Sequence, residues 1–220
     1  VDGRFPHHHP DPSLPENLIA LQAVVLAQRA DVGLAFDGDA DRLGVVDNTG
    51  AIIWPDRVLM ALAEEVLTRH PGAVVVYDIK CSWHLTRLIE RLGGQPILWK
   101  SGHSLIKAKM RETGALLGGE MTGHFAHADD WFGFDDAFYA AARLLNLLAR
   151  HPGSSADFFA AWSTGLTTPE LRLERAEGEP VAFMNRLLTQ ADFGPNARLI
   201  TVDGLRVEFP HSWGLVRASN

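Results

Sequence analysis

The chain has 220 residues, 46% of them hydrophobic and 21% charged, which is the composition of an ordinary soluble protein with room for two domains. No apolar run approaches the roughly 20 residues of a membrane-spanning helix, so we expect no association with a membrane. The formal net charge is −7 and the basic residues are scattered, which argues against nucleic acid as a partner.

The first predicted elements are one helix and three short strands. Leucine and valine recur at helical intervals over residues 15–29, and Ser13 with Glu16 has the spacing of a capping box. Short apolar runs separated by turn residues then predict strands at 32–36, 43–46 and 51–54. An acidic loop joins the first two strands.

From residue 56 onward the pattern changes to alternating helices and strands. Helices are predicted at 56–69, 83–92, 103–112 and 135–150, and strands at 74–77, 96–99 and 115–117. This alternation indicates a mostly parallel sheet with helices on both faces. Ligands bind such sheets in the loops beyond the carboxyl ends of the strands, which here are 78–80, 100–103 and 119–124.

The last part of the chain predicts a separate unit. A loop at 151–155 and a short helix come before it, and strand-like pieces follow at 171–173 and 199–202. We therefore predict three regions, with bounds at 1–51, 52–163 and 164–220. The fold class is α/β with mixed or parallel sheets covered by helices, followed by the start of a smaller α+β unit.

The acidic loop Asp37-Gly-Asp-Ala-Asp41 is the strongest local signal. Three carboxylates at alternate positions, separated by small residues, can place several oxygens around one hard cation such as Mg2+. A solvated acidic turn between two strands is the alternative, because Asp and Gly are common in turns. The metal site is favoured, since three like charges this close together are costly without a cation.

Cationic side chains near the predicted loops are candidates for holding phosphate. Arg42 follows the acidic loop, where its guanidinium could grip phosphate oxygens or simply balance the charge of the aspartates. Lys80, Lys100 and His103 lie at predicted strand ends, where a phosphate or a sugar hydroxyl could meet them. For each of these three, the alternative is an ordinary surface residue.

The glycine-bounded segment Gly119-Glu-Met-Thr-Gly-His124 lets a ligand approach the backbone closely. Glu120 and Thr122 together could bond two adjacent sugar hydroxyls. His124 ordinarily titrates near neutrality and suits proton transfer, although a loop histidine bonded to the backbone is the alternative.

Cys81 is the single cysteine, so the chain can form no internal disulfide. No secretory signal is seen at the first residues, and both observations favour a reducing cytoplasm. The sequence opens on Val1 without a start methionine and is interpreted as a fragment.

Several separately specific motifs occur in order along nearly the whole chain and together resemble the α-D-phosphohexomutase superfamily, most closely its bacterial phosphomannomutase/phosphoglucomutase branch. These motifs are Asp2-Gly-Arg-Phe-Pro-His-His-His-Pro-Asp-Pro12, Asp37-Gly-Asp-Ala-Asp-Arg42, Asp78-Ile-Lys-Cys81, Lys100-Ser-Gly-His-Ser104, Gly119-Glu-Met-Thr-Gly-His124, Trp131-Phe-Gly-Phe-Asp-Asp136 and Gly214-Leu-Val-Arg-Ala-Ser-Asn220.

The resemblance implies a four-domain enzyme, of which this chain would hold the end of the second domain, the third domain and the start of the fourth. It implies that the acidic loop binds Mg2+, that a Glu-Met-Ser-Gly loop selects sugar hydroxyls, and that an Arg-Ala-Ser-Asn motif clamps the non-reacting phosphate. Thr122 replaces the usual Ser but keeps the hydroxyl. The implied ligands are Asp37, Asp39 and Asp41 for the metal, Glu120 and Thr122 for the sugar, and Arg217, Ser219 and Asn220 for the phosphate.

The implied activity is an intramolecular transfer of phosphate between hexose 1-phosphate and hexose 6-phosphate, through a phosphoserine and a hexose 1,6-bisphosphate. The family's phosphoserine loop is absent from these 220 residues. The candidate catalytic residues are His124, Arg42 and Lys80. The resemblance also implies that the segment 119–124, called the sugar loop below, lies opposite the acidic loop across a cleft. A magnesium-dependent sugar phosphatase and a non-catalytic phosphosugar-binding module remain alternatives. Glucose and mannose are not distinguished, and a monomer is expected.

Overall fold

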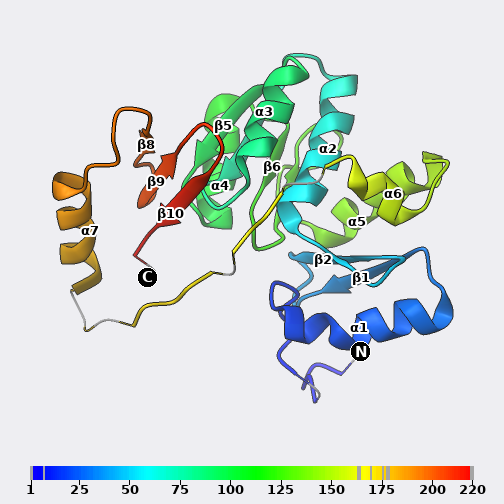
Figure 1. Cartoon of the computed structure of the whole chain (residues 1–220). Coiled ribbons are helices and arrows are strands. Elements are labelled where there is room, and N and C mark those ends of the chain that lie inside the picture. The colour runs from blue at the N-terminus through cyan, green and yellow to red at the C-terminus, as the bar shows by residue number, and fades with distance from the viewer. Residues whose placement is uncertain are drawn as a thin grey trace.

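The computed structural model describes residues 2–6, 8–162, 165–168, 170–174, 176 and 179–218. Among these residues, no helix combines the length and the apolar character needed to cross a membrane. The predicted α/β class is confirmed, with three separate sheets and helices packed on them (Figure 1). The predicted bound between 163 and 164 falls on residues outside the described ones.

The N-terminal part is an antiparallel sheet with one helix against it. Strands β1 (Val32–Phe36), β2 (Leu43–Asp47) and β3 (Ile52–Ile53) follow helix α1 (Pro15–Gln28). Pairing of β1 with β2 leaves residues 37–42 as the loop between them. The predicted capping box is wrong: the residue before the helix is Leu14, no side chain caps it, and Ser13 donates to Asp11 instead.

Alternate residues of β2 face opposite ways, as the pleat of a strand requires. Val46 packs with Leu18 and Val25 of α1, whereas Leu43 and Val45 belong to the large core of the central part. Figure 1 shows this sheet between α1 on one side and the central helices on the other. The N-terminal sheet and the central part therefore share one hydrophobic core.

The central part is a four-stranded sheet in the order β5-β4-β6-β7. Strand β4 (Val74–Asp78) runs parallel to β5 (Gln95–Trp99) and to β6 (Leu117–Gly119), which confirms the predicted parallel core. A further strand, β7 (Phe125–His127), was not predicted and pairs antiparallel with β6.

Helices cover both faces of this sheet, and the two faces have different cores. Val75 and Tyr77 point into the larger core, and Val76 points to the other face, where Ile106 and Met110 of one helix cover it. Five helix starts have a local cause: Pro15 and Pro55 occupy first helical positions, and Ser82, Asp136 and Ser154 accept capping hydrogen bonds. The helices are α2 (Pro55–Arg69), α3 (Trp83–Arg91), α4 (His103–Thr113), α5 (Ala137–Arg150) and α6 (Ser155–Ala160).

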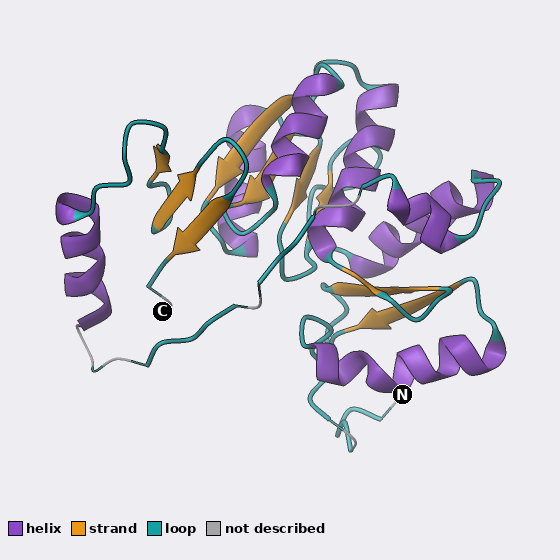
Figure 2. Cartoon of the chain, viewed as in Figure 1, coloured by secondary structure: helices purple, strands orange, loops and turns teal. Residues whose placement is uncertain are grey.

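The C-terminal part consists of one helix and a small antiparallel sheet in the order β10-β9-β8 (Figure 2). Its elements are α7 (Glu179–Gln190), β8 (Arg198–Ile200), β9 (Leu205–Glu208) and β10 (Trp213–Val216). The predicted strand at 171–173 is wrong, because these described residues form no strand. Arg206 is fully buried and donates to the carbonyl oxygens of Ile79 and Cys81 at 2.7 and 2.6 Å, which joins this part to the central one.

Candidate active site

The acidic loop brings its three aspartates together. One carboxylate oxygen from each of Asp37, Asp39 and Asp41 lies within 4.8 Å of the others, close enough to share one cation. Asp37 is 8% exposed, and its Oδ1 accepts hydrogen bonds from the backbone N–H groups of Asp41 and Arg42 at 3.0 and 3.1 Å. The loop is therefore partly buried and internally bonded, which a freely solvated turn would not be.

The electrostatics of this loop fit a bound cation. Burial raises the pKa of Asp41, and the hydrogen bond with Asp37 and the negative charges of Asp37 and Asp39 raise it further. A divalent ion among these oxygens would remove that repulsion, and oxygen donors are the ligands that hard cations such as Mg2+ or Ca2+ prefer. The donor set thus suits a metal ion.

Arg42 balances the charge of this loop. Its Nε donates to Asp37 Oδ2 at 2.6 Å, and one terminal nitrogen donates to Asp11 Oδ1 at 2.9 Å. Of the two interpretations left open by the sequence, this is the geometry of a charge-balancing partner. A phosphate contact by Arg42 stays a prediction.

The predicted sugar loop forms the connection between β6 and β7. Glu120 is only 2% exposed. Its Oε1 accepts a hydrogen bond from the backbone N–H of Gly102 at 2.5 Å, and its Oε2 lies 3.0 Å from His124 Nδ1. The Thr122 hydroxyl also lies 3.0 Å from His124 Nδ1. Glu120, Thr122 and His124 therefore meet in one cluster, beside the loop that carries His103.

The acidic loop and the sugar loop lie side by side, and not opposite each other as expected. The backbone N–H of Leu43 donates to the carbonyl of Gly123 at 3.0 Å, Arg42 and His124 form an antiparallel bridge, and His124 Nε2 lies 3.3 Å from Asp41 Oδ2. Gly123 has a φ of +100°, and an added Cβ would come 2.9 Å from the Leu43 carbonyl oxygen. The close approach of the two loops explains the glycine at this position.

His124 is held between two carboxylates. Burial alone would lower its pKa, but contact with Glu120 and the charges of Glu120, Asp41 and Asp135 outweigh that effect and raise the pKa above its ordinary value. The imidazolium form of His124 is therefore stabilised between the two loops.

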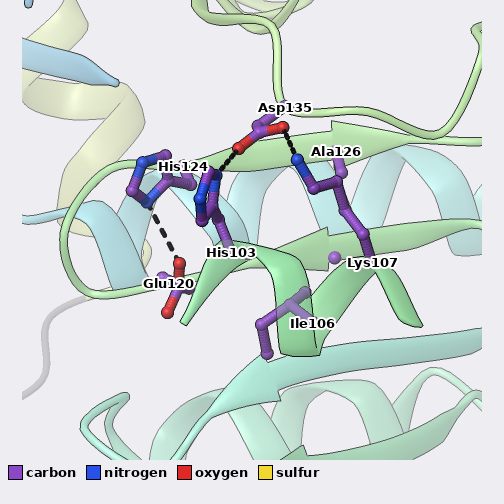
Figure 3. A pocket seen from close by; sticks show the side chains of 9 residues that line it. His103, Ile106, Lys107, Glu120, His124, Ala126 and Asp135 are labelled. Atoms are coloured by element: carbon purple, nitrogen blue, oxygen red, sulfur yellow. Dashed lines mark hydrogen bonds and ion pairs between the residues drawn. The ribbon is translucent and has the colours of Figure 1, made fainter. Parts of the chain in front are cut away.

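A small pocket opens beside these residues, between helix α4 and strands β6 and β7 (Figure 3). His103 Nδ1 lies 2.5 Å from Asp135 Oδ2, and Lys107 donates to the other oxygen of that carboxylate. The ring of His103 stacks on that of His124 with centroids 4.9 Å apart. The pocket is lined by His103, Ile106, Lys107, Gly118, Gly119, Glu120, His124, Ala126 and Asp135.

Asp78 was missed from the sequence as a site residue, although its segment was noted. Its carboxylate is fully buried at the end of β4, and burial raises its pKa. It accepts from the Ser101 hydroxyl at 2.9 Å, the Met121 N–H at 3.2 Å and the Cys81 thiol at 3.1 Å. Asp78 therefore joins all three loops that the sequence placed at the carboxyl ends of the strands.

The other predicted cations are spread around this centre. Lys80 Nζ lies 2.9 Å from Glu170 Oε2, in the segment that leads to the C-terminal part. Lys100 is exposed, and no ion pair to it is found among the described residues. The structure thus brings His103 to Glu120 and His124, but not Lys100.

Arg217 shares a carboxylate with the loop before α4. Its terminal nitrogen lies 3.0 Å from Asp203 Oδ2, and the backbone N–H of Ser101 donates to the same oxygen at 3.1 Å. Arg217 Nε is buried and has no hydrogen-bond partner within the described ranges. Ser219 and Asn220, predicted to bind phosphate with it, lie outside the described residues.

Comparison with known proteins agrees with these observations. The family model described as phosphoglucomutase/phosphomannomutase, alpha/beta/alpha domain II, matches residues 1–50, and the model for alpha/beta/alpha domain III matches residues 54–164. A crystal structure of a phosphoglucomutase/phosphomannomutase family protein from Burkholderia thailandensis is 51% identical, with a TM-score of 0.93 over 100% of this chain and 46% of that one.

Curated relatives carry similar names. A phosphomannomutase/phosphoglucomutase from Pseudomonas aeruginosa is 53% identical over 220 residues, and a phosphoglucomutase from Neisseria gonorrhoeae is 50% identical over 221 residues. Both alignments cover 100% of this chain but only 47% and 48% of those proteins, so the chain spans about half the length of these relatives. By the match of its sequence to two consecutive family models, this chain belongs to the phosphoglucomutase/phosphomannomutase family.

Proposed function

We propose that the protein containing this chain is a phosphohexomutase, which interconverts the 1-phosphate and 6-phosphate of glucose or mannose through a phosphoserine and a bisphosphorylated sugar. The observation that carries this proposal is the 3.3 Å contact between Asp41 of the acidic loop and His124 of the sugar loop. This contact supports the proposal because a cation site and a proton-transfer group that lie side by side could act on the same reacting phosphate.

The proposal is tested on the whole protein with glucose 1-phosphate, mannose 1-phosphate and a trace of hexose 1,6-bisphosphate. We expect phosphorus NMR to show the 6-phosphate appearing without free phosphate. Release of free phosphate as the main product would identify a phosphatase, and binding without turnover would identify a phosphosugar-binding module. A monomeric state and a cytoplasmic location stay predictions.

Asp37, Asp39 and Asp41 would hold Mg2+ in this scheme. When bound, Mg2+ neutralises charge on the transferring phosphoryl group. The protein's own part is to position the carboxylates, and it holds that of Asp37 through two backbone hydrogen bonds and an ion pair with Arg42. Arg42 and Lys80 are proposed to contact phosphate oxygens beside this loop.

Glu120 and Thr122 are proposed to bind adjacent sugar hydroxyls, and Lys100 and His103 are proposed as further contacts to the substrate. Their support is that the buried carboxylate and the threonine hydroxyl converge on His124, at the rim of the small pocket. Because the Glu120 carboxylate already bonds Gly102, its loss would affect both the sugar and the loop before α4.

We expect Glu120→Ala in the whole enzyme to lower kcat/KM by roughly 10- to 150-fold, since a hydrogen bond to a charged group contributes about 1.5–3 kcal/mol. Glu120→Gln retains an acceptor for Gly102 and separates the effect on the sugar from the effect on that loop. Glu90→Ala, at an exposed position of α3, is the matched control. Unchanged kinetics of both Glu120 variants on glucose and mannose phosphates would rule out the sugar contact.

Arg217, Ser219 and Asn220 are proposed to clamp the non-reacting phosphate. The support for Arg217 is its buried Nε, which has no hydrogen-bond partner among the residues that the structure describes, and its ion pair with the Asp203 carboxylate, which also accepts the Ser101 N–H. A phosphate could replace the Asp203 carboxylate in both contacts, because it offers the same kind of acceptor oxygen.

If so, Asp203 competes with the substrate for Arg217. We expect Asp203→Asn to lower KM for hexose phosphates by about 2- to 5-fold, the size of one partly exposed ion pair, with little change in kcat. Asp192→Asn, at an exposed position of the same part, should leave KM unchanged. A raised KM for Asp203→Asn would show that this carboxylate orients the clamp and does not compete with the substrate.

A further inference from the structure

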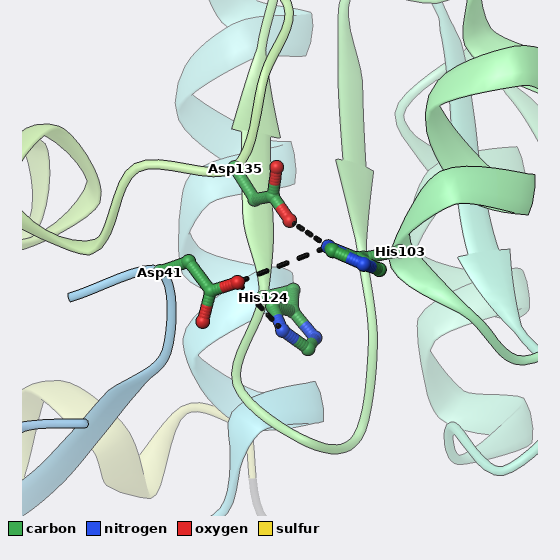
Figure 4. Close-up of side chains that lie close together, drawn as sticks. All are labelled: Asp41, His103, His124 and Asp135. Carbon is green, nitrogen blue, oxygen red and sulfur yellow. Dashed lines mark hydrogen bonds and ion pairs between the residues drawn. The ribbon is translucent and has the colours of Figure 1, made fainter. Parts of the chain in front are cut away.

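Four side chains from four separate segments meet at the acidic loop, and only Asp41 among them also belongs to the three aspartates that suit magnesium. Asp41 comes from that loop, His103 from the first turn of α4, His124 from the sugar loop, and Asp135 from the segment before α5 (Figure 4). One ligand atom from each lies within 4.8 Å of the others.

The chemistry of this set differs from that of the acidic loop. Two imidazoles and two carboxylates are the donors that zinc, cobalt and nickel ions bind well, whereas magnesium demands oxygen and retains water. Figure 4 shows the two rings and the two carboxylates turned toward a common point. The set therefore selects a softer metal than the acidic loop does.

The spacing already approaches that of a tetrahedral site. Ligand atoms about 2.0–2.1 Å from a zinc ion lie roughly 3.3 Å from one another. Asp41 Oδ2 lies 3.3 Å from His124 Nε2 and 3.8 Å from His103 Nδ1, and Asp135 Oδ2 lies 2.5 Å from His103 Nδ1. Of these three distances, that between Asp135 and His103 has to open and that between Asp41 and His103 has to close, each by less than about 1 Å, when an ion replaces the proton between Asp135 and His103.

The contacts made by the ligand side chains also support a metal site. Lys107 binds the Asp135 oxygen that faces away from His103, and Glu120 lies against His124 Nδ1, the nitrogen that does not face Asp41. Outer partners of this kind fix the orientation of ligating carboxylates and imidazoles. The two aspartates supply two negative charges for a divalent ion.

We propose that Asp41, His103, His124 and Asp135 form a second metal site, which takes Zn2+ or Co2+ and inhibits the enzyme when filled. Binding of the metal stands on the geometry alone, and the inhibition rests on the proposed mutase function. A metal ion in this site would bind the Nε2 of His124, so that this nitrogen could not transfer a proton. It would also bind the Asp41 carboxylate, which would then be a poorer ligand for Mg2+ in the acidic loop. Because Asp41 belongs to both groups, the softer ion and Mg2+ each weaken the binding of the other.

The test is a titration of the whole protein with Co2+, followed by its visible absorption, beside a calorimetric titration with Mg2+. Asp39 belongs only to the acidic group and His103 only to the second group, so each provides the control for the other. We expect His103→Gln to weaken Co2+ binding by at least about 10-fold and to leave Mg2+ affinity unchanged. Asp39→Asn should weaken Mg2+ binding and leave Co2+ affinity unchanged. Asp41→Asn should weaken the binding of both ions.

His211→Gln, at an exposed position of the C-terminal part, controls for the loss of any histidine. In the mutase assay with Mg2+ present, the Zn2+ concentration that halves each variant's own zinc-free rate should rise at least about 10-fold for His103→Gln. Unchanged Co2+ affinity and spectrum in that variant would overturn the site. Loss of Co2+ binding in Asp39→Asn alone would place the ion in the acidic loop and would also overturn it. The absorption titration tests the metal site independently, because it does not depend on mutase activity.

Discussion

Replacing His124 with asparagine in the whole enzyme is expected to lower kcat by at least about 10²-fold, the lower end of what a general acid or base contributes. The Nε2 of His124 lies 3.3 Å from the Asp41 carboxylate, and its Nδ1 lies 3.0 Å from the Glu120 carboxylate. The imidazole therefore lies where the acidic loop and the sugar loop meet. Both directions of transfer should slow, because the same group would serve each phosphate in turn.

Magnesium affinity should survive this change, since His124 is not among the three acidic-loop residues. Steady-state kinetics from pH 6 to 8, with magnesium titrated by calorimetry, separates the two effects, and His211→Asn is the matched control. Near-normal kcat over that range would make His124 a structural residue. The proton would then have to pass through another group, of which Lys80 is the next candidate.

The second large effect is expected from Asp39→Ala, which should weaken Mg2+ binding sharply and lower kcat/KM by at least about 10²-fold. A metal at a transferring phosphoryl group contributes several kcal/mol, and each 1.36 kcal/mol is about a factor of ten. Asp39 is exposed, and no hydrogen bond to its side chain is found among the described residues, so its removal should not disturb the fold.

Calorimetric titration of the purified whole enzyme measures the magnesium affinity, and a thermal melt verifies that both proteins are folded. Asp31→Ala, an exposed aspartate that ends the turn after α1, is the control because it lies outside the acidic loop. Equal magnesium affinity in Asp39→Ala and the unchanged enzyme would remove this loop as the cation site.

Much of the fold could be predicted because its elements are strongly patterned over short stretches. The apolar runs of β1, β2, β4 and β5 and the periodicity of α1 gave bounds within one or two residues of those observed. β7 was missed because it has only three residues and follows a glycine-bounded loop. The pieces at 171–173 alternate apolar and charged residues like a strand, yet within the described part of the chain no strand pairs with them.

The residues of the candidate site also divide into those that the sequence predicted and those that it did not. The acidic loop and the sugar loop are contiguous motifs, so their residue types and spacing were visible in the sequence. Asp78, Asp135 and Asp203 act through partners far along the chain: Met121 lies 43 residues from Asp78, and Ser101 lies 102 residues from Asp203. A single aspartate carries no local sign of such a partner, and only the packing of the sheet brings the pair together.

The backbone contacts between the acidic loop and the sugar loop also limit how the enzyme can open. The Leu43 N–H donates to the carbonyl of Gly123 in the sugar loop, and the Ala137 N–H at the start of α5 donates to the carbonyl of Ala40 in the acidic loop. The strands behind these loops share one core. A hinge between these two loops would have to break main-chain hydrogen bonds and expose apolar surface. The unit up to α6 should therefore move as one rigid body. For the proposed mutase function, this means that the space in which a bisphosphate turns around would come from movement of other parts of the whole protein.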